Sequence, residues 1–395
     1  MANEQDFDFE EIDFATGQPY AQWQRARERC PVIRSDDSLM GFGRPLFQIT
    51  RRDDVEAVLR DASTFSSSIN LEHMLPYMGE LILGMDGDEH RRYRNLVAPA
   101  FRASRLEQWE ATVIRPSIQM FIDEIAPLGR ADLVRDITKR YPVRVICAIV
   151  GVPIDDSAQF QAWAEDINGG PIHPREGLIA SQAMSDYLAP LIEARREEPS
   201  DDLLSDLLHA EIDGERLSEE RLYGFLKFLL PAGAETTFRV MGNALTALLL
   251  YPDVMEAVRA DRTRVAALIE ETLRWESSIT QVSRVASIDT EVGGCPIAAG
   301  AAIAVIVGSA NRDAAYFDAA EEFDLDRVTQ RHVAFGTGPH MCLGMHLARL
   351  ELRVGLNAIL DGLPNLRLDP AAPAPLIEGL AFRGPASLPV LFDSQ

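Results

Sequence analysis

The sequence predicts a mainly α-helical protein with a minor β region, built as a single large domain (1–395) around a long central helix. Amphipathic helical patterns cover most of the chain, whereas strand-like runs are sparse and short. The two patterns do not alternate as they do in βαβ units, and no internal repeat occurs. After Ser218, apolar residues recur at helical spacing as far as Leu250, and Pro252 ends the pattern. A helix of this length would span roughly 50 Å.

In chain order, the patterns predict helices over 20–30, 53–60, 106–128, 142–150, 157–166, 176–197, 201–209 and 219–250. They predict strands near 46–50, 285–292, 302–307 and 388–391. The segment 66–83 is expected to be a loop. An uncharged run over 292–310 approaches the roughly 20 residues of a membrane-spanning helix. Glycines and prolines interrupt this run, so turns and a short strand explain it better.

Composition restricts the class of protein. The chain has 395 residues, of which 47% are hydrophobic and 25% are charged, which suits one large domain or two ordinary ones. The formal net charge of −23 argues against nucleic acid or an anionic membrane as a partner. Four scattered cysteines without paired spacing favour a reducing compartment. Residues 1–12 have neither the basic start nor the apolar run of a signal peptide. We therefore expect a cytoplasmic protein without a membrane anchor.

A loop rich in glycine and proline runs into a helical pattern at Cys342. Gly336, Gly338 and Pro339 suit a tight turn that brings backbone close to a bulky group. At the beginning of a helix, amide groups and the helix dipole favour a thiolate over a thiol. Because the basic His340 stands two residues earlier, such a thiolate suits the axial position of a large, flat, anionic cofactor.

Two plainer interpretations of this cysteine compete. Most lone cysteines are small buried apolar residues, and this is the default for Cys30, Cys147 and Cys295. A zinc site is the other alternative, and its ligands would be His332, His340, Cys342 and His346. That spacing fits none of the common zinc templates, and no Cys-x-x-Cys pair supports it.

The run 335–344 reads Phe-Gly-Thr-Gly-Pro-His-Met-Cys-Leu-Gly, and it resembles the haem-binding signature of the cytochrome P450 superfamily at every defined position. The resemblance extends in the right order from about residue 83 to 349 and implies the soluble bacterial-type fold. It also implies that Cys342 ligates the iron of haem b (iron protoporphyrin IX) as a metal ligand, with Phe335, Gly336 and Gly344 around the cofactor.

The middle of the predicted long helix violates the rules for helices. Pro231 removes a backbone hydrogen bond, and Thr236 can bond backward to a carbonyl. Glu235 places a carboxylate in an apolar centre, which is costly unless the carboxylate is used. A simple kink and a buried ion pair are the plain alternatives. The segment 232–236 resembles the oxygen-activation motif of the same family, which implies that a kinked helix opens a slot for dioxygen. It also implies that Glu235 and Thr236 are catalytic, with Glu235 relaying protons from solvent and the Thr236 hydroxyl holding the activated oxygen.

The roles of several further basic and acidic residues are implied only by the family resemblance. His90 and Arg94 share one face of a helix that Asp86 or Asp88 could cap, and alone they would be a solvated charged face. The resemblance implies that the haem propionates are bound by His90, Arg94, Arg284 and His340. Glu271 and Arg274 could form a surface salt bridge. In the family this pair joins an Asn-Arg-Asp segment and a later arginine in a structural core network. The matching parts of this sequence are 311–313, which includes Arg312, and the segment 322–327.

Together these features predict a haem-thiolate monooxygenase, an oxidoreductase that uses O2 to oxygenate an apolar small organic molecule. No flavin-binding loop or iron–sulfur cysteine cluster is present, so electrons should come from a separate ferredoxin and its reductase. A peroxygenase that uses hydrogen peroxide and a non-catalytic haem sensor or carrier are the alternatives. By family analogy, the substrate pocket is expected to include Ile69, Leu71, Met74, Leu75, Ala232, Ile279, Val282 and Phe382. Against the overall negative charge, ferredoxin docking is expected to use Arg91, Arg92, Arg349 and Arg353.

Overall fold

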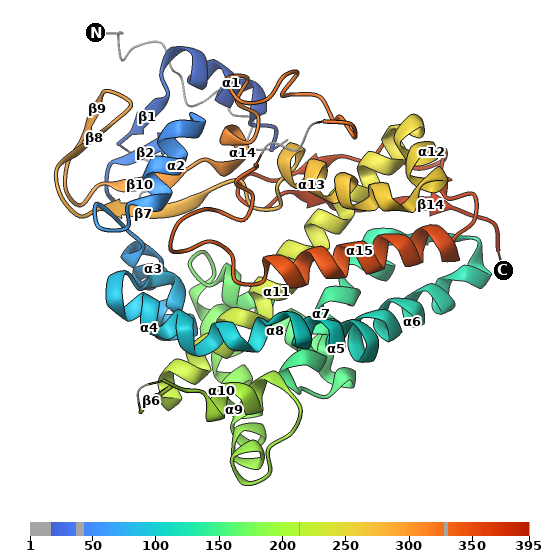
Figure 1. The fold of residues 1–395 in the computed structure, drawn as a ribbon, viewed down its shortest axis with the longest axis horizontal. Coiled ribbons are helices and arrows are strands. Elements are labelled where there is room, and N and C mark those ends of the chain that lie inside the picture. The colour runs from blue at the N-terminus through green and yellow to red at the C-terminus, as the bar shows by residue number, and fades with distance from the viewer. Residues whose placement is uncertain (1–16, 37–42, 213, 328–330, 395) are drawn as a thin grey trace. The chain divides into compact units, whose positions relative to one another are not determined.

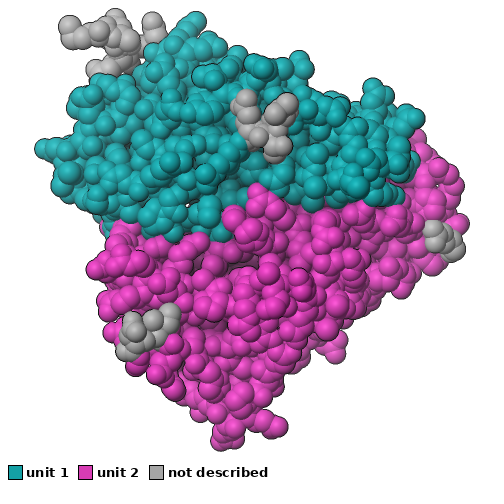
Figure 2. Space-filling view, in the orientation of Figure 1, with its two compact units in different colours: residues 1–69, 242–342, 374–386 teal, residues 70–241, 343–373, 387–395 magenta. Residues whose placement is uncertain are grey.

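The computed structural model describes residues 17–36, 43–212, 214–327 and 331–394, and the chain forms two compact units (Figure 2). Unit 1 comprises 1–69, 242–342 and 374–386, and unit 2 comprises 70–241, 343–373 and 387–395. The prediction that the chain lacks a signal peptide concerns the acidic segment 1–12, which lies outside the described residues. The prediction of a mainly helical chain with a minor β region is confirmed (Figure 1).

Unit 1 contains a five-stranded sheet in the order β1-β2-β10-β7-β3. Its strands are β1 (Val32–Ser35), β2 (Leu46–Ile49), β3 (Phe65–Ser66), β7 (Val282–Ala286) and β10 (Ala302–Val305). β2 and β10 are parallel, and the other neighbours are antiparallel. Because side chains alternate along a strand, Ile303 and Val305 pack in one hydrophobic cluster, whereas Ala302 and Ala304 pack in the other. The central strand is therefore apolar on both faces.

Short helices and hairpins complete unit 1. The helices are α1 (Tyr20–Arg29), α2 (Arg52–Arg60), α12 (Pro252–Ala260), η9 (Arg262–Arg264), α13 (Val265–Trp275) and α14 (Val307–Ala310). The hairpins pair β8 (Thr290–Val292) with β9 (Cys295–Ile297) and β12 (Ile377–Glu378) with β13 (Gly384–Pro385). The predicted turns and short strand over 292–310 are thus present. Among the described residues, no helix is both long and apolar enough to cross a membrane.

Unit 2 is mostly helical (Figure 1). Its α-helices are α3 (Ser68–Met78, which begins in unit 1), α4 (Gly87–Val97), α5 (Ala103–Trp109), α6 (Arg115–Ile125), α7 (Arg140–Val150), α8 (Ser157–Gly169), α9 (Pro174–Glu197), α10 (Leu203–His209) and α15 (Met345–Gly362). Shorter turns are η3 (Ile82–Gly84), η4 (Ala98–Phe101), η5 (Glu110–Ile114), η6 (Ala126–Leu128), η7 (Val134–Thr138) and η8 (Ile154–Asp156). The strands β4 (Arg130–Asp132), β11 (Arg367–Leu368) and β14 (Pro389–Leu391) form one small sheet, and β5 (Glu211–Ile212) pairs with β6 (Glu215–Arg216).

The predicted long helix is α11 (Glu219–Leu250), which contributes 219–241 to unit 2 and 242–250 to unit 1. The hydroxyl of Ser218 accepts a hydrogen bond from the amide of Arg221 at 3.3 Å, as expected of an N-cap. The helix continues without a break through Pro231. The hydroxyl of Thr236 donates to the carbonyl of Ala232 at 2.9 Å, so the predicted backward bond is present.

Several predicted boundaries were wrong for identifiable reasons. The segment 66–83 is mostly the helix α3, whose last turn includes Pro76 and buries Tyr77 and Met78, so tertiary burial overrides the local loop signals. The predicted helix over 106–128 is divided by the π-helical turn η5, and the strand over 285–292 is two strands, β7 and β8. Helix α15 begins at Met345 rather than directly after Cys342.

Candidate functional site

The cysteine loop in unit 1 is a tightly hydrogen-bonded turn. The amide of Cys342 donates to the carbonyl of Phe335 at 2.8 Å, and the amide of Met341 donates to that of Gly338 at 3.2 Å. Gly336 and Gly338 have φ of 69° and 73°, which side chains rarely tolerate. A Cβ at Gly338 would also lie 2.6 Å from the carbonyl oxygen of Leu59. Glycine is therefore required at Gly338 for both conformation and space.

The four cysteines of the chain differ in their surroundings. Cys147 is buried, and burial raises the pKa of its thiol to about 12. Cys30 donates its thiol hydrogen to the carbonyl of Val32 at 3.2 Å. Cys295 is only half-exposed, whereas the side chain of Cys342 is exposed. Of the four, Cys342 is thus the one presented to an external ligand.

The position that follows the cysteine loop has room for a side chain. A Cβ built at Gly344 would meet no atom within 4 Å, although Gly344 lies only two residues beyond Cys342. The predicted zinc alternative gains nothing, because His332 instead contacts Glu270, with 3.1 Å between Nε2 and Oε2. In the described part of the chain, no group of three or more potential ligands is arranged to hold a metal ion. A single exposed thiol suits the axial ligand of a flat cofactor better than a cluster of metal ligands.

Two of the predicted propionate-binding residues belong to unit 1. Arg284 lies on β7, is only 4% exposed, and donates to the carbonyl of Ser283 at 2.7 Å. His340 is half-buried in the cysteine loop, and its Nε2 lies 3.1 Å from the hydroxyl of Ser67. A buried guanidinium and a held imidazole are suitable donors for an anionic cofactor.

The other two lie on α4 in unit 2. His90 is buried, with 4% of its surface exposed, and Arg94 is half-buried one turn later. Asp86, one of the two predicted caps, occupies the N-cap position, but its side chain makes no capping hydrogen bond. By contrast, Arg91 and Arg92 on the same helix are mostly exposed and pair with Asp88 and Glu215. One face of the helix therefore carries the buried or half-buried pair His90 and Arg94, and another carries the exposed pair Arg91 and Arg92.

The predicted acid of α11 is held by two side chains in unit 2. One oxygen of Glu235 accepts from Arg239 at 2.9 Å, and the other accepts from Asn168 of α8 at 2.8 Å. About a fifth of the Glu235 side chain is exposed. The spacing of four residues could have suggested Arg239 from the sequence. No local signal could have suggested Asn168, because it lies 67 residues away along the chain.

Glu271 and Arg274 form a buried bidentate pair in unit 1, not a surface salt bridge. The guanidinium Nε and a terminal nitrogen lie 2.8 and 2.7 Å from the two carboxylate oxygens. Arg274 also donates to the backbone carbonyl of Asn311 at 3.1 Å, and Glu271 accepts from Arg327 at 3.1 Å. The structure thus brings together the pair, the Asn-Arg-Asp segment and a later arginine.

Arg312 does not join that pair. It contacts Glu276 at 3.1 Å and Glu321 at 3.0 Å, and its guanidinium lies 3.5 Å from the ring centroid of Tyr20. Glu276 also accepts from the hydroxyl of Tyr20 and from Arg383. Burial and the adjacent carboxylate raise the pKa of Tyr20. This second buried network was missed because its members are scattered over the sequence and match no motif.

The predicted substrate-pocket residues differ in exposure. Ile69 is 1% exposed and packs in a hydrophobic cluster of unit 1, so it offers no surface to a ligand. Also in unit 1, Ile279 forms a β-bridge with Phe382, which is 39% exposed, and Val282 lies on β7. In unit 2, α3 carries Leu71, Met74 and the 46%-exposed Leu75, and α11 carries the half-buried Ala232.

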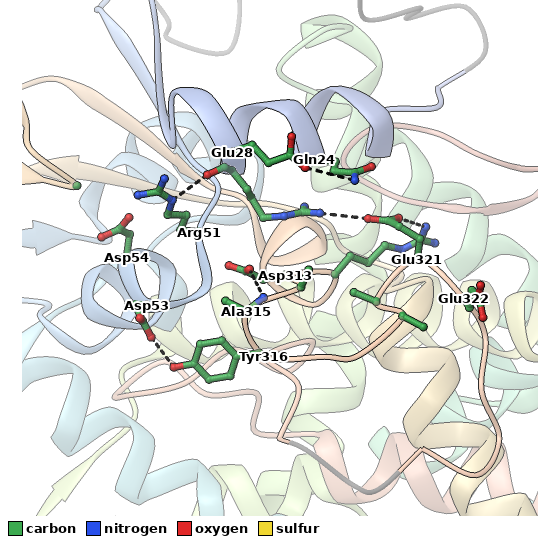
Figure 3. A pocket seen from close by; sticks show the side chains of 16 residues that line it. Gln24, Glu28, Arg51, Asp53, Asp54, Asp313, Ala315, Tyr316, Glu321 and Glu322 are labelled. Carbon is green, nitrogen blue, oxygen red and sulfur yellow. Dashed lines mark hydrogen bonds and ion pairs between the residues drawn. The ribbon is translucent and has the colours of Figure 1, made fainter. Parts of the chain in front are cut away.

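Unit 1 also contains a cavity of about 690 Å³ (Figure 3). It is lined largely by charged side chains, among them Arg27, Asp53, Asp313 and Glu321. Arg27 pairs with Glu321 at 3.1 Å across this lining. None of the predicted haem, relay or substrate residues lines the cavity. Its charged walls are unlike a pocket for an apolar small molecule.

Comparison with known proteins gives consistent matches. The family model described as Cytochrome P450 matches residues 171–364. The chain is 33% identical over 389 residues to the polyketide biosynthesis cytochrome P450 PksS of Bacillus subtilis, covering 94% of this chain and 95% of PksS. It is 34% identical over 389 residues to the cytochrome P450 monooxygenase PikC of Streptomyces venezuelae, covering 93% and 90%.

Solved structures agree with these matches. Cytochrome P450 CYP109Q5 from Chondromyces apiculatus superposes with a TM-score of 0.87 at 32% identity and covers 96% of both chains. CYP109E1 from Bacillus megaterium in complex with testosterone gives a TM-score of 0.85 at 30% identity, covering 95% of this chain and 99% of that one.

Proposed function

Because the chain belongs to the cytochrome P450 family, we propose that Cys342 is the thiolate ligand of its haem. The protein is a haem-dependent monooxygenase, an oxidoreductase that uses O2, a redox partner and a small-molecule substrate. The peroxygenase and sensor alternatives have no support among its relatives. The assignment of Cys342 rests on its exposure on a loop that contains two required glycines. The other three thiols are buried or half-buried.

The haem is proposed to be haem b, with its propionates bound by Arg284, His340, His90 and Arg94. The burial of Arg284 and His90 supports this, because desolvated cationic or polar donors bind carboxylates through strong, charge-assisted bonds. Phe335, Gly336 and Gly344 are proposed to lie around the haem, and the carbonyl of Phe335 accepts from the amide of Cys342 at 2.8 Å.

When bound, the haem iron supplies the activation of O2, with the thiolate favouring O–O cleavage. We propose that Thr236 and Glu235 supply the protons. The Thr236 hydroxyl donates its hydrogen bond to the carbonyl of Ala232, and about a fifth of the Glu235 side chain is exposed. A carboxyl group with access to solvent can take up a proton and pass it to a neighbouring hydroxyl.

The substrate is proposed to be an apolar small molecule. Its proposed contacts are Leu71, Met74 and Leu75 of α3, Ala232 of α11, and the bridged residues Ile279 and Phe382. Two structural neighbours were solved with testosterone and corticosterone, and another with erythromycin B. A ligand screen should therefore begin with steroids and macrolides and monitor the spin-state shift of the haem.

The redox partner is proposed to be a ferredoxin that docks on Arg349 and Arg353 of α15. Arg353 is 47% exposed, although Glu110 lies 2.9 Å from it and offsets part of its charge. Arg91 and Arg92 are each neutralised by an acidic neighbour, so their contribution is proposed to be smaller. The four free cysteines support the further proposal of a cytoplasmic location. The family resemblance alone supports the proposal of a single catalytic domain over 1–395.

The assignment of Cys342 is tested by Cys342→Ala, with Cys147→Ala as the matched control. The reduced carbonyl complex of the parent should show the optical band typical of a thiolate ligand. Cys342→Ala should abolish this band, whereas Cys147→Ala should retain it. An unchanged band in Cys342→Ala would show that another residue ligates the iron.

A further inference from the structure

Ser67 contacts a residue that the cysteine loop contributes to the proposed haem site. Its hydroxyl lies 3.1 Å from Nε2 of His340, although 273 residues separate the two along the chain. Both residues belong to unit 1. A hydroxyl can donate or accept a hydrogen bond, so the contact forms whichever nitrogen of the imidazole carries the proton. His340 is a proposed propionate donor, whereas Ser67 matches no motif.

Ser67 lies at a fixed junction between a strand and a helix. Ser66 of β3 lies opposite Val285 of β7 in an antiparallel pair. Ser67 and Arg284 are the next residues on the two strands, so they adjoin each other where the pairing ends. Helix α3 begins directly afterwards at Ser68, whose amide donates to the hydroxyl of Ser66 at 3.1 Å. Strand pairing on one side and a helix on the other therefore fix the position of Ser67.

Burial decides how Ser67 can act. Its side chain is 0% exposed, whereas His340 is half-buried. A side chain without accessible surface cannot itself bind a carboxylate, so Ser67 must act through a neighbour. Its contact holds one nitrogen of a rigid ring that is also anchored at its Cβ, so the direction of the whole imidazole is restrained. A donor that is already oriented loses less freedom when it binds its ligand.

We infer that Ser67 is a positioning residue for the haem propionates, which holds His340 in place beside the strand that carries Arg284. This inference rests on the proposed function of His340 and Arg284 as propionate donors. Arg284 is 4% exposed and donates to the carbonyl of Ser283 at 2.7 Å, so its position is also restrained. Ser67 adjoins Arg284 along the sheet and contacts His340 through its hydroxyl, so it keeps the two donors in one arrangement.

The test compares Ser67→Ala with Ser68→Ala in the holoenzyme. Ser68 is the next residue and begins α3, so its substitution removes a hydroxyl of the same kind from the same junction. Resonance Raman spectroscopy detects the bending modes of the haem propionates, which respond to the hydrogen bonds that the propionates accept. These bands should shift in Ser67→Ala, in the direction seen in His340→Ala, and stay in place in Ser68→Ala.

The second measurement is the rate at which the holoenzyme loses haem to an excess of a haem-scavenging apoprotein. Loss of one orienting contact should raise this rate about twofold to tenfold, because the side chain must then be ordered when it binds the propionate. Ser68→Ala should keep the rate of the parent. In a His340→Ala background, removal of the Ser67 hydroxyl should change neither the bands nor the rate further, because Ser67 acts through His340.

Two results would overturn this role of Ser67. Unshifted propionate bands in Ser67→Ala would show that its hydroxyl only fills the junction between strand and helix. An equal shift from Ser67→Ala in the parent and in the His340→Ala background would show that Ser67 does not act through His340. Failure of the proposed function is distinguishable, since His340→Ala itself would then leave the propionate bands where they are in the parent.

Discussion

Glu271 in unit 1 and Glu235 in unit 2 both pair with an arginine on their own helix, yet their surroundings differ. Glu271 is 5% exposed, and its carboxylate accepts from two arginines and a backbone amide. Glu235 keeps about a fifth of its side chain exposed and has two donors, one of them neutral. A fully bonded, buried carboxylate fixes architecture. A partly exposed carboxylate with only two donors, one of them neutral, is held less firmly.

The largest effect should come from breaking the Glu271 pair. Arg274→Ala leaves a buried carboxylate without its bidentate partner, which typically costs about 3–5 kcal/mol of unfolding free energy. Denaturant unfolding of the holoenzyme measures this loss. The control is Arg216→Ala, which removes an exposed ion pair with Glu211 and should cost less than about 1 kcal/mol. Equal losses in the two variants would show that the buried Glu271 pair contributes no more than an exposed ion pair.

The centre of α11 should respond in activity rather than in stability. Thr236→Ala removes a hydroxyl whose hydrogen bond is to its own helix, so the unfolding free energy should change by less than about 1 kcal/mol. Substrate binding, read from the spin-state shift, should be retained. Reducing equivalents should instead be diverted to hydrogen peroxide, which a peroxide assay during turnover detects. Tightly coupled turnover in this variant would argue against a proton role for Thr236.

A third glutamate extends the comparison to a carboxyl group with an unsatisfied atom. Glu351 on α15 is 2% exposed, and its Oε2 has no hydrogen-bond partner among the described residues. Burial raises its pKa well above the usual range. The folded state therefore binds a proton that the unfolded chain releases, and this contribution to stability is present at low pH and is lost as pH rises toward the folded pKa.

Glu351→Gln should remove the loss of stability with rising pH, because a neutral amide of the same shape has no proton to release. The melting temperature of the variant should exceed that of the parent at neutral pH and converge with it, or fall below it, in mild acid. Glu378→Gln, at a half-buried glutamate in unit 1, is the control and should keep the pH dependence of the parent. A parallel pH dependence in Glu351→Gln would show that Glu351 is ionised in the fold.

The smallest effect should follow from Arg239→Ala. The pair with Glu235 is partly exposed on both sides, and pairs of neighbouring turns contribute only about 0.3–0.5 kcal/mol. Thermal unfolding should thus barely change. A loss close to that of Arg274→Ala would place Glu235 with the architectural carboxylates.

The sequence by itself determined the features that depend on neighbours along the chain. Glycines at 336 and 338 dictate the turn that presents Cys342, and helical periodicity dictates α11 and its N-cap at Ser218. Such features follow from backbone sterics and side-chain spacing within a few residues, so the motif and the helix could be predicted together. The same local rules failed at α3, where burial of Tyr77 and Met78 outweighs the turn-forming residues.

Only the tertiary structure decided which distant groups meet. It places Asn168 on Glu235, assigns Arg327 rather than Arg312 to Glu271, and gathers Tyr20, Glu276 and Arg383 into a second network. It also distinguishes the exposed Cys342 from one buried and two half-buried cysteines. Partner choice and burial depend on contacts between residues far apart along the chain, and local propensity carries no information about those contacts.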